Sequence, residues 1–271
     1  MNAVRRYLLA LQFFTRIPVT GALARWVGFS PRMLRASAAH FPGVGLLVGG
    51  LCAAVYGALA LALPDTAFTM LVAAALSTAF GVWITGAFHE DGLADVADGL
   101  GGSGSRDRAL EIMKDSRVGA FGAIAAALAL LCKVALLALL GAVDWRVAMA
   151  ALVSAHVASR TLPLLLIRLL PHVGDAAGSK SKPLADRIGG VALAVGGLWC
   201  AAGLGLAGIE LLPLELLGGV ALATLAWLWM WRLFARRLAG FTGDCLGATQ
   251  QVCEIAFYLG LALAMPVGAG A

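Results

Sequence analysis

The amino-acid sequence predicts an all-α protein that crosses a membrane several times. Hydrophobic residues make up 61% of its 271 residues and charged residues only 13%, whereas an ordinary soluble domain is about 45–50% apolar. The mean hydropathy of +0.90 points the same way. The apolar residues occur in continuous runs, without the alternation of a membrane β-barrel. Each run is expected to be a helix, because lipid offers backbone groups no hydrogen-bond partners.

Seven apolar runs are the candidate membrane spans, since a spanning helix needs about 17–25 residues. They are Pro42–Leu63, Ala67–Phe88, Ala120–Gly141, Val147–Leu170, Ile188–Ile209, Leu214–Phe234 and the weaker Val252–Gly268. Together they predict a polytopic helix bundle that forms a single membrane domain over residues 1–271. If the seventh run spans, the carboxyl terminus lies outside. The sequence permits a homo-oligomer without specifying an oligomeric state.

Lysine and arginine residues are distributed unevenly among the connections. They cluster before the first run, between the second and third, around the gap between the fourth and fifth, and after the sixth, whereas the opposite connections hold only Arg146. Positively charged loops stay on the cytoplasmic side. The amino terminus is therefore predicted to be cytoplasmic, in a bacterial cytoplasmic (inner) membrane. The net charge of +5 is explained by this asymmetry and needs no nucleic-acid partner.

Three aspartates follow the second apolar run, in the stretch FHEDGLADVADG. Asp91, Asp95 and Asp98 are four and then three residues apart, so a helix would project them from one face. Unpaired carboxylates in this arrangement repel each other. A hard divalent cation such as Mg²⁺ would relieve the repulsion, and Mg²⁺ commonly binds through a few carboxylates together with substrate phosphates. Residues 89–118 are therefore predicted to form a cytoplasmic active-site segment.

Basic residues follow the aspartates in the stretch SRDRALEIMKDSRVG. The candidates for binding phosphate oxygens are Arg106, Arg108, Lys114 and Arg117. Asp107, Glu111 and Asp115 recur in the same stretch at helical spacing. A solvated helix whose charges pair among themselves would show the same pattern, so this alternative stays open for the basic segment.

Further polar residues stand near or inside the later apolar runs. Asp244, in TGDCLGA, is either the cap of a helix or part of a second acidic site. Lys133 and Arg160 lie inside apolar runs, where a charge is costly unless it is paired, and Glu254 is a candidate partner. Structural and substrate-binding roles are both open for these two bases.

Several segments along the chain form a recognisable set: FFTRIPV at 13–19, FPGVGLLVG at 41–49, TGAFHEDGLADVADG at 85–99, SRDRALEIMKDSRVG at 105–119, SR at 159–160 and TGDCLGA at 242–248. Together they resemble the cobalamin synthase (adenosylcobinamide-GDP ribazoletransferase) family over nearly the whole chain. The third and fourth segments in combination are highly specific. DGLAD by itself would not be.

The resemblance implies a phosphoryl-transfer reaction. In this family a hydroxyl of α-ribazole, or of its 5′-phosphate, attacks the phosphate attached to adenosylcobinamide in adenosylcobinamide-GDP. GMP leaves, the product is adenosylcobalamin or its 5′-phosphate, and Mg²⁺ is the cofactor. These partners and this cofactor are implied by the resemblance and agree with the separate interpretation of the acidic and basic residues.

The resemblance also implies roles for individual residues. The predicted metal ligands are Asp91, Asp95, Asp98, Asp115 and Asp244. The first three are also the predicted catalytic residues, with Asp91 the first choice for accepting the hydroxyl proton. The predicted substrate-binding residues are Arg106, Arg108, Lys114, Arg117, Lys133 and Arg160. Gln251 stands where the family commonly has glutamate. The loop Val173–Gly190, with Lys180 and Lys182, matches the family only loosely.

Other classes of protein are compatible with parts of the pattern. A divalent-cation transporter would place its acidic ligands along a path near the bilayer midplane, often at broken helices. A membrane CDP-alcohol phosphotransferase would use related chemistry, but this chain lacks the AR spacing of that family's motif. A noncatalytic assembly protein would leave the acidic cluster unexplained.

Overall fold

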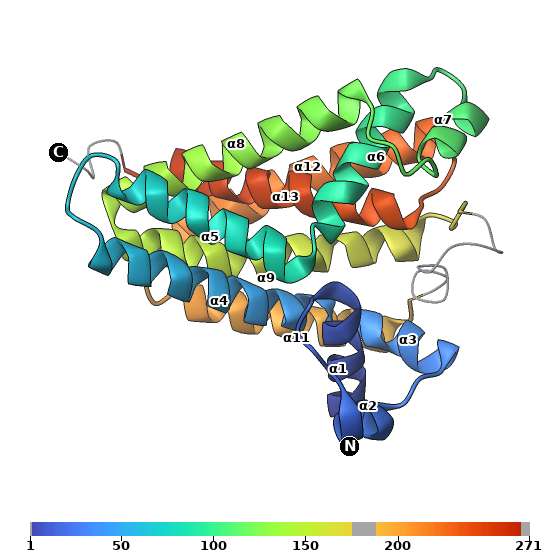
Figure 1. Ribbon diagram of the computed structural model, residues 1–271, viewed down its shortest axis with the longest axis horizontal. Coiled ribbons are helices and arrows are strands. Elements are labelled where there is room, and N and C mark those ends of the chain that lie inside the picture. Colours follow the sequence, from blue (N-terminus) through green and yellow to red (C-terminus); the bar gives the residue numbers. More distant parts are fainter. Residues whose placement is uncertain (1, 175–187, 267–271) are drawn as a thin grey trace.

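The computed structural model describes residues 2–174 and 188–266, and the described chain is a bundle of helices (Figure 1). The helices are α1 (Asn2–Phe14), α2 (Gly21–Val27), α3 (Pro31–Ser37), η1 (Ala38–His40), α4 (Phe41–Ala62), α5 (Thr69–Thr85), α6 (Phe88–Gly102), α7 (Arg106–Ile112), α8 (Ala120–Val143), α9 (Trp145–Leu169), α11 (Gly190–Ala207), α12 (Pro213–Arg237) and α13 (Gly243–Ala264). Within the described residues, the one strand-like feature is an isolated bridge between His172 and Phe241. The all-α prediction is confirmed.

The membrane character is also confirmed, with a count of spans close to the seven expected. Five segments are long and apolar enough to cross a bilayer alone: α4 with the turns before it, α8, α9, α11 and α12. α5 and α6 meet the same criteria only as a pair, which is bent by 88°. α13 contains most of the seventh predicted run, but its first three turns carry several polar side chains.

The break between α5 and α6 is produced by two consecutive residues in the left-handed region. Gly86 has a φ of 68° and caps the end of α5, and Ala87 has a φ of 59°. Glycine adopts this conformation at little cost, whereas alanine does not. The predicted span Ala67–Phe88 therefore stops at Thr85, and the acidic stretch that follows runs in a new direction.

The interior of the bundle is formed by α9 and α13. α9 is the most buried of the five candidate spans, and α13 packs against α6, α8, α9 and α12. The outer helices expose large apolar side chains, among them Leu128 of α8, Leu198 of α11 and Leu225 of α12. In a membrane protein such faces contact lipid, so the polar residues of the interior are screened on most sides.

The basic segments gather at one end of the bundle. Figure 1 shows α3, α6 and α7 toward one end, whereas the α4–α5 and α8–α9 turns lie at the other. α1 lies across the bundle rather than along it, an arrangement compatible with a helix at the membrane interface (Figure 1).

Candidate functional site

The acidic stretch and the TGDCLGA segment meet, although they are about 150 residues apart in the sequence. The contact is made by α6 and the first turns of α13, and it depends on glycine. A Cβ atom on Gly92 would lie 2.9 Å from the carbonyl oxygen of Asp244, and one on Gly247 would lie 3.3 Å from the backbone of His89. The two helices can approach this closely because neither carries a side chain at the contact. Asp91 and Asp244 are thereby brought near each other and near Asp95. We call Asp91, Asp95 and Asp244 the acidic cluster.

The carboxylates of this cluster lack compensating bases. Asp91 is exposed and Asp95 is half-buried, and within the described residues neither accepts a hydrogen bond or forms an ion pair. The charges of Asp244, Asp91 and Asp98 all act on Asp95 as like charges. Such repulsion has no benefit for folding, and a bound cation would remove it.

Asp244 does not cap α13. The cap is Thr242, whose hydroxyl oxygen accepts a hydrogen bond from the backbone N–H of Cys245. The same hydroxyl donates to Asp244 Oδ2 at 3.1 Å. Of the two roles that the sequence left open for Asp244, the structure favours membership of an acidic site.

Asp98 differs from the other aspartates of α6. It is buried, and its carboxylate accepts hydrogen bonds from the backbone N–H groups of Gly119 at 2.6 Å and Gly122 at 2.8 Å. These groups belong to the first turn of α8, where unpaired N–H groups attract a negative charge. Asp98 therefore joins α6 to the start of α8, and both of its oxygens are engaged.

The fit of this cluster to Mg²⁺ can be judged from its donors. Among the described residues, no three histidine, cysteine, aspartate or glutamate side chains are arranged to hold a metal ion by themselves. Asp91, Asp95 and Asp244 nevertheless offer oxygen atoms, which Mg²⁺ prefers, and Mg²⁺ usually completes its shell with water and substrate phosphates. The residues fit an ion that binds together with a substrate.

The basic segment pairs largely with its own acids. The ion pairs are Arg106–Asp107 at 3.3 Å, Arg108–Glu111 at 2.7 Å and Arg117–Asp115 at 2.5 Å. Hydrogen bonds from Arg117 lower the pKa of Asp115 to about 2. The self-pairing expected of a solvated helix is thus present. Exposed pairs contribute little to stability, so a substrate phosphate can replace the acid in each pair at small cost.

A surface depression of about 620 Å³ lies beside the basic segment. Its walls include Asp98 of α6, Arg108 of α7, Asp115 and Arg117 of the following loop, and the start of α8 at Ala120. Glu111 also borders the depression, and both arginines are paired with acids there, so an anionic group would have to replace Glu111 and Asp115 as their partners.

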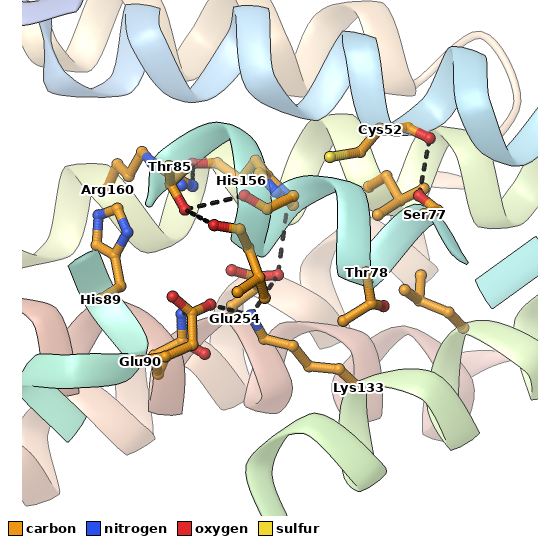
Figure 2. Close-up of a pocket in the computed structure, with 15 residues that line it drawn as sticks. Cys52, Ser77, Thr78, Thr85, His89, Glu90, Lys133, His156, Arg160 and Glu254 are labelled. Atoms are coloured by element: carbon orange, nitrogen blue, oxygen red, sulfur yellow. Dashed lines mark hydrogen bonds and ion pairs between the residues drawn. The ribbon is translucent and has the colours of Figure 1, made fainter. Parts of the chain in front are cut away.

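Lys133 lies in a different environment, inside the bundle. Its Nζ is 3.2 Å from Glu254 Oε1 and 3.8 Å from Glu90 Oε1. Figure 2 shows the three side chains converging from α8, α13 and α6. The side chain of Lys133 is 6% exposed and that of Glu254 is 3% exposed. The expectation that Glu254 pairs with a base inside the membrane is confirmed for Lys133.

Arg160 belongs to the same buried group. Its Nη1 donates to the carbonyl oxygen of His156 at 3.1 Å, and both residues border a cavity of about 20 Å³ near the α5–α6 break (Figure 2). Four buried polar atoms of the lining residues have no hydrogen-bond partner among the described residues: Glu90 Oε2, His156 Nδ1, Arg160 Nε and Gln251 Oε1. The cavity suits about one water molecule. We call Glu90, Lys133, His156, Arg160, Gln251 and Glu254 the buried polar centre.

The basic end also contains a contact that the sequence did not single out. Arg237, at the end of α12, donates from Nη2 to the carbonyl oxygens of Leu100 at 3.2 Å and Ser103 at 2.6 Å. It thereby satisfies the carboxyl end of α6. From the sequence, Arg237 is only one of the basic residues that follow the sixth apolar run. Its contacts could not be predicted, because its partners are backbone atoms far away in the chain. Lys180 and Lys182, in the loop noted above, lie outside the described residues.

Comparisons with known proteins show the family to which the chain is similar. The model of the cobalamin-5-phosphate synthase family matches residues 6–262. A protein of Albidiferax ferrireducens named adenosylcobinamide-GDP ribazoletransferase is 66% identical, over 97% of this chain and 99% of its own. Proteins of the same name from Polaromonas naphthalenivorans and Vibrio cholerae are 63% and 41% identical, over 98% and 96% of this chain and 100% and 95% of theirs. No solved structure matches.

Proposed function

Because the chain belongs to the cobalamin-5-phosphate synthase family, we propose that it joins adenosylcobinamide-GDP to α-ribazole, or to α-ribazole 5′-phosphate. The products are GMP and adenosylcobalamin, or its 5′-phosphate. The observation that carries this proposal is the meeting of α6 and α13, which brings Asp91, Asp95 and Asp244 together without a compensating base. The basic segment follows α6 in the chain, and its helix α7 packs against α6.

The residues of α6 and those of the basic segment would have separate roles in the transfer. A new P–O bond forms between the α-ribazole hydroxyl and the phosphorus attached to cobinamide, and the bond to the GMP oxygen breaks. We assign to Asp91, which is exposed and unpaired within the described chain, the role of accepting the hydroxyl proton. Phosphoryl transfer depends mainly on positioning and on neutralising charge, which we assign to the basic segment of Arg106, Arg108, Lys114 and Arg117.

We assign Mg²⁺ to the carboxylates Asp91, Asp95 and Asp244. When bound, the ion would neutralise charge on the diphosphate and on the departing GMP. Asp98 and Asp115 were predicted as ligands too, but Asp98 is occupied by backbone N–H groups and Asp115 by Arg117. We propose that Asp98 supports the site by fixing α6 to the start of α8, and that Asp115 does so by orienting Arg117.

Lys133 and Arg160 were predicted to bind substrate, and their burial favours another role. Both are about 5–6% exposed, and neither borders the depression beside the basic segment. Glu90, which pairs with Lys133, directly precedes Asp91 in α6. We propose that the two bases hold the start of α6 in place and so position Asp91.

The site would face the cytoplasm of a bacterial inner membrane. This orientation follows from the gathering of basic residues at the end of the bundle that carries α3, α6 and α7 (Figure 1). A cation transporter is disfavoured, because the polar residues at the α5–α6 break include the bases Lys133 and Arg160, which repel a cation.

Release of GMP from adenosylcobinamide-GDP tests this function. The purified protein in lipid would be given α-ribazole and Mg²⁺, with Asp91→Ala and Glu111→Gln variants alongside. We expect GMP and cobalamin from the wild type and from Glu111→Gln, but not from folded Asp91→Ala. An inactive wild type that is folded would overturn the assignment, and equal activity of Asp91→Ala would remove Asp91 from its centre.

A further inference from the structure

A second large groove, of about 820 Å³, lies away from the acidic cluster, between α1, α3 and the start of α11. Three arginines border it: Arg6 of α1, and Arg32 and Arg35 of α3. Neither the proposed reaction nor the family resemblance gives these side chains a role. Figure 1 shows α1 and α3, which contribute to the groove, on one side of the bundle.

The groove carries positive charge without an internal counter-ion. Among the residues that the structure describes, no acidic one borders it, and the sequence contains no aspartate or glutamate before Asp65. None of the three arginines forms an ion pair within the described chain. Three guanidinium groups around one groove favour an anionic ligand, and guanidinium matches phosphate oxygens in geometry.

The opposite wall of the groove is apolar. It is formed by Ile188 and by α11 residues that include Val191 and Val195. Val191 is 82% exposed, and Leu198, which lies on the same helical face two turns further along, is 71% exposed. α11 is one of the candidate membrane spans. This face therefore continues from the groove into the region that contacts hydrocarbon.

We propose that the groove binds an anionic phospholipid, with its phosphate on Arg6, Arg32 and Arg35 and its acyl chains along α11. A soluble phosphate or nucleotide would use the arginines but would leave the apolar wall without a partner. Basic pockets at the cytoplasmic ends of membrane helices are suited to anionic head groups. The occupant would also anchor α1, whose last residue, Phe14, packs against Phe88 of α6 at 5.5 Å between ring centroids.

Native mass spectrometry of the protein from mixed micelles tests the proposal. Phosphatidylglycerol and phosphatidylcholine would be supplied in equal amounts, and bound lipid compared for wild type, Arg35→Gln and Arg25→Gln. Arg25→Gln is the matched control: it removes the same charge as Arg35→Gln, but from an exposed arginine of α2 that does not border the groove. A triple Gln variant of Arg6, Arg32 and Arg35 would extend the series, and a thermal scan in phosphatidylcholine would establish that each variant is folded.

We expect preferential retention of phosphatidylglycerol by the wild type and by Arg25→Gln. Retention should weaken about fivefold for each groove arginine removed, the equivalent of about 1 kcal/mol per residue near a membrane surface. Equal retention of both lipids by the wild type would overturn the proposal, as would the same loss in Arg25→Gln. Displacement of the lipid by guanosine diphosphate would identify the groove as a nucleotide subsite instead. None of these outcomes depends on the transferase activity.

Discussion

The buried polar centre and the acidic cluster adjoin at the start of α6, where Glu90 belongs to the first and Asp91 to the second. They differ in whether their carboxylates are paired with bases. In the buried polar centre, Glu90 and Glu254 lie beside Lys133 within 3.8 Å and 3.2 Å. One residue after Glu90 the pattern changes, because Asp91 and then Asp95 have no base beside them in the described chain. Charge is balanced inside the bundle and left unbalanced at its end.

The difference separates structural charges from functional ones. A buried charge without a partner would destabilise the fold, so those that persist inside are paired. An accessible cluster can keep an imbalance at lower cost, and the imbalance creates affinity for a cation and for the phosphates bound with it. On this view, the acidic cluster should tolerate neutral substitutions that the buried polar centre does not.

The largest expected effect is the loss of activity in Asp95→Asn. Removing this carboxylate should lower kcat by about 100-fold or more, as for other groups that stabilise developing charge. The thermal midpoint should stay level or rise, because the repulsion from Asp91 and Asp244 is reduced. GMP release and a thermal scan measure the two quantities. A fall in both would place Asp95 among the structural charges and break the comparison.

Lys133→Met should produce the largest loss of stability. It leaves Glu90 and Glu254 facing each other in the interior, and breaking a buried pair costs about 3–5 kcal/mol. We expect a clear fall in the midpoint of thermal unfolding. Glu254 would keep its hydrogen bonds from Gln250 and Tyr258 but lose its lysine, so adding Glu254→Gln removes an uncompensated charge and should recover part of the loss. If Lys133→Met alone were as stable as the wild type, the prediction would be wrong, and the buried polar centre would be hydrated enough to tolerate a free carboxylate.

Asp98→Ala should have an intermediate effect. Loss of a helix cap costs about 1 kcal/mol, and the first turn of α8 loses the acceptor for the N–H groups of Gly119 and Gly122. Hydrogen exchange should accelerate in peptides covering 119–123 and remain unchanged in α13. Asp98→Asn retains an acceptor and serves as the control. Unchanged exchange in the alanine variant would contradict the capping role.

The smallest effect on stability is expected for Arg108→Gln. The Arg108–Glu111 pair is exposed on both sides, so its loss should leave the thermal midpoint unchanged. If Arg108 contacts the diphosphate, KM for adenosylcobinamide-GDP should rise severalfold while KM for α-ribazole does not. An equal rise in both KM values would contradict a diphosphate contact, because α-ribazole carries no phosphate for Arg108 to bind. Steady-state kinetics with each substrate varied in turn decides between these results.

Much of the fold could be predicted from the sequence because membrane helices are specified locally. All seven apolar runs lie largely within helices, and the uneven charge matches the two ends of the bundle. The break at Gly86 and Ala87 was missed, since apolar composition continues across it and alanine does not favour the left-handed conformation that Ala87 adopts.

The candidate site was predictable in its residue types but not in its arrangement. The spacing of Asp91, Asp95 and Asp98 correctly suggested a helix, but it could not show that Asp98 turns to the start of α8. The meeting of Gly92 with Asp244 depends on packing between distant segments. The burial of Lys133 was apparent from hydropathy, whereas its pairing with both Glu90 and Glu254 required the positions of three helices.

Binding of Mn²⁺, observed by electron paramagnetic resonance in the presence of adenosylcobinamide-GDP and without α-ribazole, tests the central claim most directly. The wild type and Glu111→Gln should bind the ion, because Glu111 is already compensated by Arg108. Asp95→Asn should bind it at least tenfold more weakly while keeping the wild-type thermal midpoint. Equal Mn²⁺ affinity in the wild type and Asp95→Asn would contradict the claim that the unbalanced carboxylates of α6 form a cation-dependent site.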